Sequence, residues 1–547
     1  MLGQMLTMVW MSLSFFAAQQ APGDFAGEKY HVSGVVVDEK TGMPIARATV
    51  HLGVPTDVEV GQTQRTGVDG RFDFGDVTAG RYNLNARRRG YLRGMYLQHE
   101  GFASAIVVGA GVDNEHLRFG MKEAATISGN VIDENGDAVR GAQVMLFRES
   151  TSDGKGSRRS GSQVSTDDEG HYEIHYLAQG TYFVAVYAQP WYAQYAQRQE
   201  FQIAGATGSF TKSTREPALD MVYPVTFFSN AGELSGAAAL TLRPGDSERA
   251  DFMMHPQPGL RIQVRVREGE QGEAAIGMMA QMMIGGSRHP VNANVVQVAP
   301  GVMEVSGLPP GLVELRADGR GEGNAWNVVQ SVNLSGNATV DLTPARTIGT
   351  VSGSVRIENG APLADRVMIQ LHNRATGETL VAASGPDGKF SFLGQATVAG
   401  DYELSILQPA GFGVKSISAT GSKATGRVIH VADGQEMELS VVATKRSAKI
   451  KGVVLRDDQP VVGAMVVLVP AGAQEDATEY RRDQSDSDGS FNLTFVSPGK
   501  YTVVALEKGW EMEWAKPGVL QKYLAGGEIV QVGADEKTEV KVKVKVQ

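Results

Sequence analysis

The chain contains 547 residues, with a formal net charge of −10 and no cysteine. This length exceeds what one hydrophobic core supports, because cores stop growing at about 250–300 residues, and several domains are therefore expected. The lack of cysteine excludes disulfides, thiolate metal ligands and cysteine nucleophiles. The acidic balance, without long runs of Lys or Arg, argues against nucleic acid as a partner. The 66 glycines show no Gly-X-Y period and favour short strands joined by tight turns.

An apolar run from Met5 to Ala18 is the first element of the chain. Its length is typical of the core of a secretory signal peptide and is shorter than the ~20 residues that a transmembrane helix needs. The small residues that follow suit cleavage, although no Lys or Arg precedes the run, and a buried N-terminal segment is the alternative. We expect residues 1–29 to be a signal peptide with a short linker. The mature chain would then be extracytoplasmic (periplasmic, cell-surface or secreted) and have no transmembrane segment.

Three motifs then recur along the chain. Each unit begins with an apolar strand containing Ser-Gly or Lys-Gly, as at 32–38, 127–133, 351–355 and 450–454. An acidic-glycine turn leads into alternating aromatic residues, and Gly-x-Tyr closes the motif. The turns are Asp69-Gly70, Glu169-Gly170, Asp387-Gly388 and Asp488-Gly489, and the closing tyrosines are Tyr82, Tyr182, Tyr402 and Tyr501.

The closing glycines, with a degenerate copy at Gly311, lie about 90–130 residues apart. This is the size of an independently folding β-sandwich. The predicted units are 30–123, 124–257 with a longer insertion, 258–346 in degenerate form, 347–445 and 446–547.

Local chemistry supports strands in each unit. The alternation Phe72-x-Phe74 has period two, so one face is buried and one is wet. Asp-Gly supplies the positive φ that a tight hairpin needs, and the closing tyrosine is expected to bury its ring and bond a backbone group through its hydroxyl. Residues 273–284 (EAAIGMMAQMMI) form the best helix candidate, but alternation in the repeat frame favours a strand with Ile276 and Ile284 facing inward.

These residues resemble the carboxypeptidase regulatory-like domain, a transthyretin-like (prealbumin-like) sandwich related to collagen-adhesin B-type repeats and to carbohydrate-binding-like folds. The signature runs from G-x-V-x-[DE] through G-x-P-[ILV]-x-[GN]-A-x-V and T-x-x-DG-x-[FY] to G-x-Y. It is matched by 31–91, 126–191, 351–412 and 449–510, and loosely by 259–318. The resemblance implies an all-β chain of about five tandem Greek-key sandwiches, like arrays in bacterial proteins. It is weak for function, because such modules are appended to many proteins.

The motifs of catalysis are missing from the sequence. None of the ten histidines has Glu three residues later, and neither H-E-x-x-H nor G-x-S-x-G occurs. Three carboxylates, Asp483, Asp486 and Asp488, precede Gly489, but hairpin chemistry explains them better than calcium binding. We therefore predict no catalytic residue, no metal site and no cofactor.

Aromatic clusters are the best indication of a binding surface. Trp191, Tyr192, Tyr195, Trp510 and Trp514 could form platforms that stack on sugar rings. The alternative is structural for Trp191 and Trp510, because an aromatic residue recurs nine or ten residues after each repeat tyrosine. The members of this slot are Tyr91, Trp191, Phe412 and Trp510.

The function favoured by these patterns is a non-enzymatic extracytoplasmic scaffold, structural or adhesive, with a protein or polysaccharide partner at the cell surface. One alternative is an array of carbohydrate-binding modules. A further alternative is an accessory subunit of a peptidase or an outer-membrane transporter. The ligand and the oligomeric state stay open.

Overall fold

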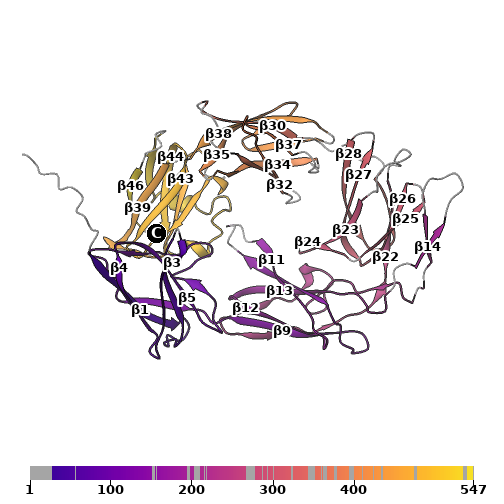
Figure 1. The fold of residues 1–547 in the computed structure, drawn as a ribbon, viewed down its shortest axis with the longest axis horizontal. Helices are drawn as coiled ribbons and strands as arrows, with labels where there is room; N and C mark the ends of the chain where they lie inside the picture. The colour runs from indigo at the N-terminus through magenta and orange to yellow at the C-terminus, as the bar shows by residue number, and fades with distance from the viewer. Residues whose placement is uncertain are drawn as a thin grey trace, which may run out of the picture.

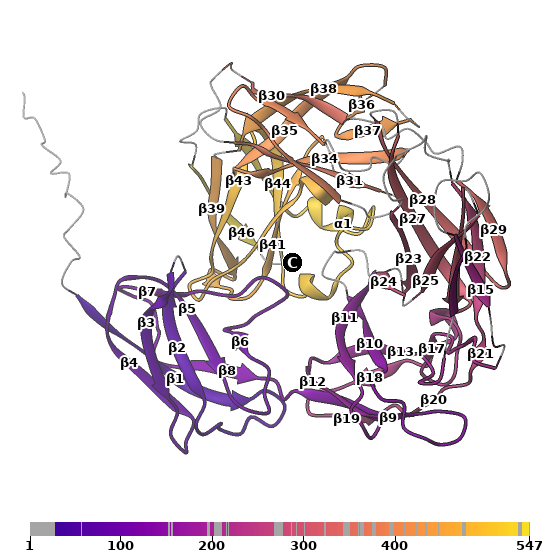
Figure 2. The same cartoon turned by 45° about the vertical axis from the view of Figure 1, so that its right-hand side comes forward.

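The computed structural model describes residues 28–545 with short gaps, the longest being 202–209, 267–276 and 343–350. In these described residues the major sheets pair as five successive β-sandwiches, which confirms the predicted all-β tandem fold. Figures 1 and 2 show the sandwiches following one another around a ring, so that the first (indigo) lies beside the fifth (yellow). Most of the predicted signal peptide, residues 1–27, lies outside the described residues.

Strands of the first two sandwiches are as follows. The first contains β1 (Lys29–Asp38), β4 (Arg71–Thr78) and β8 (Leu117–Met121) in one sheet, and β2 (Thr49–Val54), β3 (Asp57–Arg65), β5 (Gly80–Arg87), β6 (Gly94–Met95) and β7 (Ile106–Val108) in the other. The second contains β9 (Ala125–Ile132), β12 (His171–Leu177), β19 (Ser247–Arg249) and β20 (Phe252–Met253), opposite β10 (Gln143–Ser150), β11 (Ser157–Ser165), β13 (Gly180–Tyr187), β17 (Thr226–Phe227) and β18 (Leu240–Leu242). Its insertion carries β14 (Gln197–Phe201), β15 (Phe210–Thr214), β16 (Met221–Val222) and the short helix η1 (Leu234–Gly236), and β16 pairs with β21 (Gln257–Pro258).

The third and fourth sandwiches repeat this plan. The third pairs β22 (Leu260–Arg265), β25 (Asn294–Ala299), β26 (Val302–Leu308) and β29 (Ala338–Asp341) with β23 (Gly277–Ile284), β24 (Ser287–Pro290), β27 (Gly311–Gly321) and β28 (Asn324–Leu334). The fourth pairs β30 (Val351–Ile357), β33 (Lys389–Ser391), β35 (Phe412–Ala419) and β38 (Met437–Lys445) with β31 (Met368–Asn373), β32 (Thr379–Ala383), β34 (Gly400–Gln408), β36 (Ala424–Thr425) and β37 (Val428–Val431).

The fifth sandwich adds short helices to the plan. Its sheets contain β39 (Ala448–Arg456), β40 (Gln459–Pro460), β43 (Ser490–Val496) and β46 (Glu539–Lys545), and β41 (Met465–Pro470), β42 (Arg481–Gln484), β44 (Gly499–Leu506) and β45 (Glu528–Val532). The helices are η2 (Ala477–Glu479), η3 (Gly509–Glu511) and α1 (Gln521–Leu524). No helix in the described part of the chain is long and apolar enough to cross a membrane.

One pairing recurs in all five sandwiches. The last strand joins the first strand in parallel: β8 with β1, β19 and β20 with β9, β29 with β22, β38 with β30, and β46 with β39. The start and the end of each unit therefore lie side by side in one sheet.

Turn glycines adopt the predicted positive φ. Gly70, Gly170, Gly388 and Gly489 have φ of 72°, 74°, 78° and 76°. A Cβ on Gly70 would also lie 2.6 Å from the carbonyl oxygen of Val36, so a side chain is excluded by space as well as by conformation.

The hydroxyl residue four positions before the turn glycine fixes the second strand. In the first sandwich the Thr66 hydroxyl donates to the Ile45 carbonyl at 2.7 Å and accepts from the Ala48 N–H at 2.9 Å. Thr166 and Ser485 make the equivalent pair of bonds in the second and fifth sandwiches. This explains the Thr of the T-x-x-DG motif, since a buried hydroxyl must satisfy both its donor and its acceptor.

The closing tyrosines form the expected corner. The hydroxyls of Tyr82, Tyr182 and Tyr501 donate to the carbonyls of Thr78, Ala178 and Ser497, each four residues earlier, at 3.0, 2.7 and 2.8 Å. The described part of the segment 273–284 is a strand, as predicted: β23 covers Gly277–Ile284, with Ala280, Met282 and Ile284 buried. Ile276 lies outside the described residues.

Candidate functional site: aromatic residues and the interface of the first and fifth sandwiches

The predicted aromatic residues lie in two different environments. Trp191 is 88% exposed and meets Tyr192 edge to face, with ring centroids 5.7 Å apart. Trp510 and Trp514 are buried, with exposures of 7% and 8%. Tyr195 lies outside the described residues. The structure therefore groups Trp191 with Tyr192 and separates both from Trp510 and Trp514.

Burial of Trp510 and Trp514 follows from the strands beneath them. The outer face of β41 and β44 is apolar, carrying Met465, Val467 and Leu506, and such a face must be covered. The segment that follows β44, including η3, turns back over it and places both tryptophans there. The Trp510 ring nitrogen donates to the carbonyl of Gly463 at 3.1 Å, so this indole is also satisfied from the fifth sandwich.

Trp510 also contacts the first sandwich. The His99 ring stacks on the Trp510 ring, with centroids 5.5 Å apart and planes 6° apart, and the Phe102 ring lies 5.2 Å away. The Arg482 guanidinium lies 3.9 Å from the Trp514 ring centroid and forms an ion pair with Glu100 at 3.1 Å. Burial lowers the pKa of Arg482 and Glu100 opposes that shift, so the pairing keeps this cation charged.

A polar layer lies beside the aromatic cluster. Ala105 N–H donates to the Asp486 carboxylate at 2.8 Å, and Ser487 N–H donates back to the Ala105 carbonyl at 3.0 Å. The Ser104 hydroxyl donates to the Ser485 carbonyl at 2.7 Å. The turn that fixes the fifth sandwich internally therefore also binds the first sandwich, about 380 residues away in sequence.

Asp486 is the most buried charge of this layer, at 1% exposure, and it pairs with Arg81 at 2.6 Å. Burial raises the pKa of the Asp486 carboxyl to about 6, although the Arg81 cation and the Ala105 N–H both lower it. Gln484 completes the layer: its amide donates to the Leu97 carbonyl at 2.7 Å and to the Ser104 hydroxyl at 2.9 Å.

The second sandwich reaches the same cluster. Ala515 N–H donates to the carbonyl of Gly154 at 2.9 Å, and a Cβ on Gly154 would lie 2.5 Å from the Trp514 ring. Trp514 is thus enclosed by side chains of its own sandwich and by the backbone at Gly154. In this closed arrangement a sugar could not stack on Trp510 or Trp514 without parting the sandwiches.

Sequence reasoning missed the first sandwich's share of this interface. Residues 97–107 lie between repeat motifs and carry no pattern that marks them as contacts. The acidic turn at Asp486 was visible in the sequence, but its partners Arg81 and Ala105 belong to another unit. The described residues hold no group of three or more His, Asp or Glu side chains arranged to bind a metal.

Comparison with known families agrees with the sandwich geometry. The model of the carboxypeptidase regulatory-like domain matches residues 31–119 and 126–255. The first two sandwiches are carboxypeptidase regulatory-like domains. Within the fifth sandwich, residues 448–522 match the model described as BOS complex subunit NOMO1-like, second beta sandwich domain. The search of curated proteins returned no match.

Solved structures share only remote similarity with this chain. The streptococcal ancillary pilin is 10% identical, covering 57% of this chain and 98% of its own, with a TM-score of 0.19. Shaft pilin SpaA from Lactobacillus rhamnosus GG is 11% identical, covering 42% and 98%, with a TM-score of 0.19. The Bacillus anthracis TIE protein is 12% identical, covering 77% and 73%, with a TM-score of 0.15. At these scores the likeness carries no argument about function.

Proposed function

We propose that the chain is a non-enzymatic, extracytoplasmic scaffold whose first and fifth sandwiches hold the array in a closed ring. The observation that supports this most is the interface itself, which combines a stacked aromatic cluster with a buried hydrogen-bonded layer. An array of independently mobile modules would not need such an interface. A closed ring fixes the loops and sheet edges of five sandwiches relative to one another, which suits a rigid display surface for a protein or polysaccharide partner.

The location and the non-catalytic role are tested together. Cell fractionation of the full chain should place it outside the cytoplasm, and deletion of residues 1–29 should retain it in the cytoplasm. Purified protein should release no C-terminal amino acid from a panel of peptides. Cytoplasmic full-length protein would contradict the location, and peptide hydrolysis that survives rigorous purification would contradict the non-enzymatic role.

Carbohydrate binding at Trp191 is a second candidate function, favoured by the 88% exposure of this indole. A flat, exposed ring is the kind of surface on which sugar rings stack. On a glycan array, Trp191→Ala should abolish binding, whereas Trp191→Phe should retain part of it. Binding that is unaffected by Trp191→Ala would exclude this platform.

A further inference from the structure

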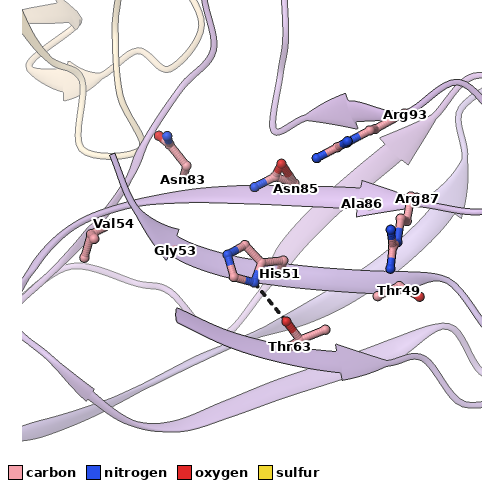
Figure 3. Close-up of a pocket in the computed structure, with 10 residues that line it drawn as sticks. All are labelled: Thr49, His51, Gly53, Val54, Thr63, Asn83, Asn85, Ala86, Arg87 and Arg93. Atoms are coloured by element: carbon pink, nitrogen blue, oxygen red, sulfur yellow. Dashed lines mark hydrogen bonds between the residues drawn. The ribbon is translucent and has the colours of Figure 1, made fainter. Parts of the chain in front are cut away.

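The outer face of the first sandwich carries a pocket of about 250 Å³ that the aromatic clusters do not include. It lies across β3, β2 and β5 and the segment before β6, as Figure 3 shows. Its lining residues are Thr49, His51, Gly53, Val54, Thr63, Asn83, Asn85, Ala86, Arg87 and Arg93. The set contains two arginines and no acidic residue.

Strand register explains how these residues meet. Residues directly opposite each other on neighbouring strands share a face of the sheet. His51 lies between Thr63 on β3 and Asn85 on β5, and Thr49 lies opposite Arg87. Gly94 on β6 pairs with Ala86, which brings Arg93 beside Arg87 at one end of the pocket. Asn83 lies toward the other end, and Asn85 lies between Asn83 and Arg93 (Figure 3).

The outer face of the equivalent strand pair carries different residues in the other sandwiches. Positions equivalent to those of the pocket are mostly apolar in the second and fifth sandwiches, where they are covered. The cross-strand pairs are Thr49–Arg87, His51–Asn85 and Gly53–Asn83 in the first, Gln143–Tyr187, Met145–Ala185 and Phe147–Phe183 in the second, and Met465–Leu506, Val467–Val504 and Val469–Thr502 in the fifth. The third sandwich covers this outer face of the second sandwich, and the segment with Trp510 covers it in the fifth.

The fourth sandwich carries a polar version of this face. Its equivalent pair is His372–Glu403, and Glu403 forms an ion pair with Arg427 at 2.9 Å. The charge on that face is therefore neutralised within the protein. In the first sandwich the pocket lining supplies two cations and no carboxylate to balance them.

Polar groups of the pocket suit a particular ligand chemistry. The lining holds two guanidinium groups and no carboxylate, and an oxyanion would accept charge-assisted hydrogen bonds from such groups. Asparagine amides donate and accept, as hydroxyl groups do. The His51 Nδ1 bonds the Thr63 hydroxyl at 2.9 Å, while its Nε2 has no hydrogen-bond partner among the described residues. An unsatisfied polar atom of this kind is costly unless a ligand or water completes it.

We propose that this pocket binds an acidic sugar unit, with its carboxylate on Arg87 and Arg93 and its hydroxyls on Asn83 and Asn85. The volume is below the range of about 300–1,000 Å³ typical of drug-sized ligands, which suits one saccharide residue. The pocket is separate from Trp191 and does not depend on the scaffold role.

The test measures binding of uronic acid oligomers to the full chain by isothermal titration calorimetry. Oligomers of glucuronate, galacturonate and mannuronate are compared with neutral glucose and galactose oligomers and with inorganic phosphate. At least one uronate oligomer should bind, neutral oligomers should not, and phosphate should bind at least tenfold more weakly. Equal binding of phosphate would reduce the pocket to an oxyanion site and overturn the sugar assignment, and failure of all three uronates would overturn the proposal.

Variants assign the binding to the pocket. Arg87→Ala should weaken uronate binding at least tenfold, whereas Arg89→Ala, an exposed neighbour with the same charge change outside the lining, should stay within twofold. Asn85→Leu should weaken the uronate several-fold without changing phosphate binding. Unfolding midpoints confirm that each variant is folded. Equal losses in Arg87→Ala and Arg89→Ala, or abolition by Trp191→Ala alone, would overturn the proposal.

Discussion

The first and fifth sandwiches pair two equivalent strands in the same register, β2 with β5 and β41 with β44. The outer faces of these two strand pairs differ in character. In the fifth, Met465, Val467 and Leu506 form an apolar face that Trp510 and Trp514 cover. In the first, the equivalent face carries Thr49, His51 and Arg87 and stays open as a pocket. The inward positions of both units obey one motif, so the motif specifies the fold, and the outward positions decide whether the face is covered or open.

The largest expected effect comes from removing the cover of the fifth sandwich. Trp510→Ala should lower the free energy of unfolding by about 3–5 kcal/mol, the usual cost of truncating a large buried aromatic residue. The measurement is urea unfolding followed by circular dichroism. Trp191→Ala is the matched control and should stay within about 0.5 kcal/mol, because this ring is exposed. Equal losses in the two variants would break the distinction between covered and open faces.

The next effect concerns the buried ion pair between the two sandwiches. Arg81→Ala leaves the Asp486 carboxyl buried without its cation. Breaking a buried ion pair in this way typically lowers the free energy of unfolding by about 3 kcal/mol or more. We expect a somewhat smaller loss here, because Arg81 is part-exposed. Hydrogen exchange of residues 97–107 should accelerate, because the Ala105 and Val107 amides bond Asp486 and Ser487 across the interface. Arg71→Ala, which removes only a surface pair with Asp69, should leave this exchange unchanged.

A smaller effect is expected from the buried hydroxyl before the turn glycine, which is Thr66 in the first sandwich and Ser485 in the fifth. Thr66→Val removes the bonds to Ile45 and Ala48 and leaves a buried N–H without a partner, which costs about 1–3 kcal/mol. Urea unfolding of the variant should show this loss, and Thr241→Val, at an exposed position of β18, serves as control. No loss in Thr66→Val would show that the hydroxyl does not fix the second strand.

The smallest effect is a pH dependence of the interface. Because burial raises the pKa of Asp486 to about 6 from its ordinary value of 3.8, the closed form binds a proton that the open form has released. The stabilisation from this group is present at low pH and is lost as pH rises through about 6. The urea midpoint for opening should therefore be higher at pH 5 than at pH 7.5, and Asp486→Asn should reduce that difference. The opposite sign in the native chain would contradict the raised pKa.

The sequence allowed the fold to be predicted because its determinants are local. The positive φ of Gly170, the hydrogen bond of Tyr182 and the strand at 277–284 each depend on residues close in the chain or on a simple alternation. The repeat strengthened the prediction, because the strands and turns assigned in one copy of the motif had to fit the other three copies.

The sites were less predictable because they depend on contacts between units. Trp510 and Trp191 occupy the same position after the repeat tyrosine, yet one is buried and the other is exposed. The difference comes from Met465 and Val467 beneath Trp510 and from His99 beside it. The pocket was missed for a related reason: Thr49, His51, Asn85 and Arg87 become neighbours only through cross-strand register.

Ring closure is tested most directly by the distance between spin labels on the first and fifth sandwiches. The chain has no cysteine, so Val68→Cys and Ile529→Cys at exposed positions provide the only two labelling sites. Double electron–electron resonance should give one narrow distance distribution in the native background, which broadens in Trp510→Ala and Arg81→Ala. A broad distance distribution in the native background, unchanged by these substitutions, would show that the first and fifth sandwiches move independently and would contradict ring closure.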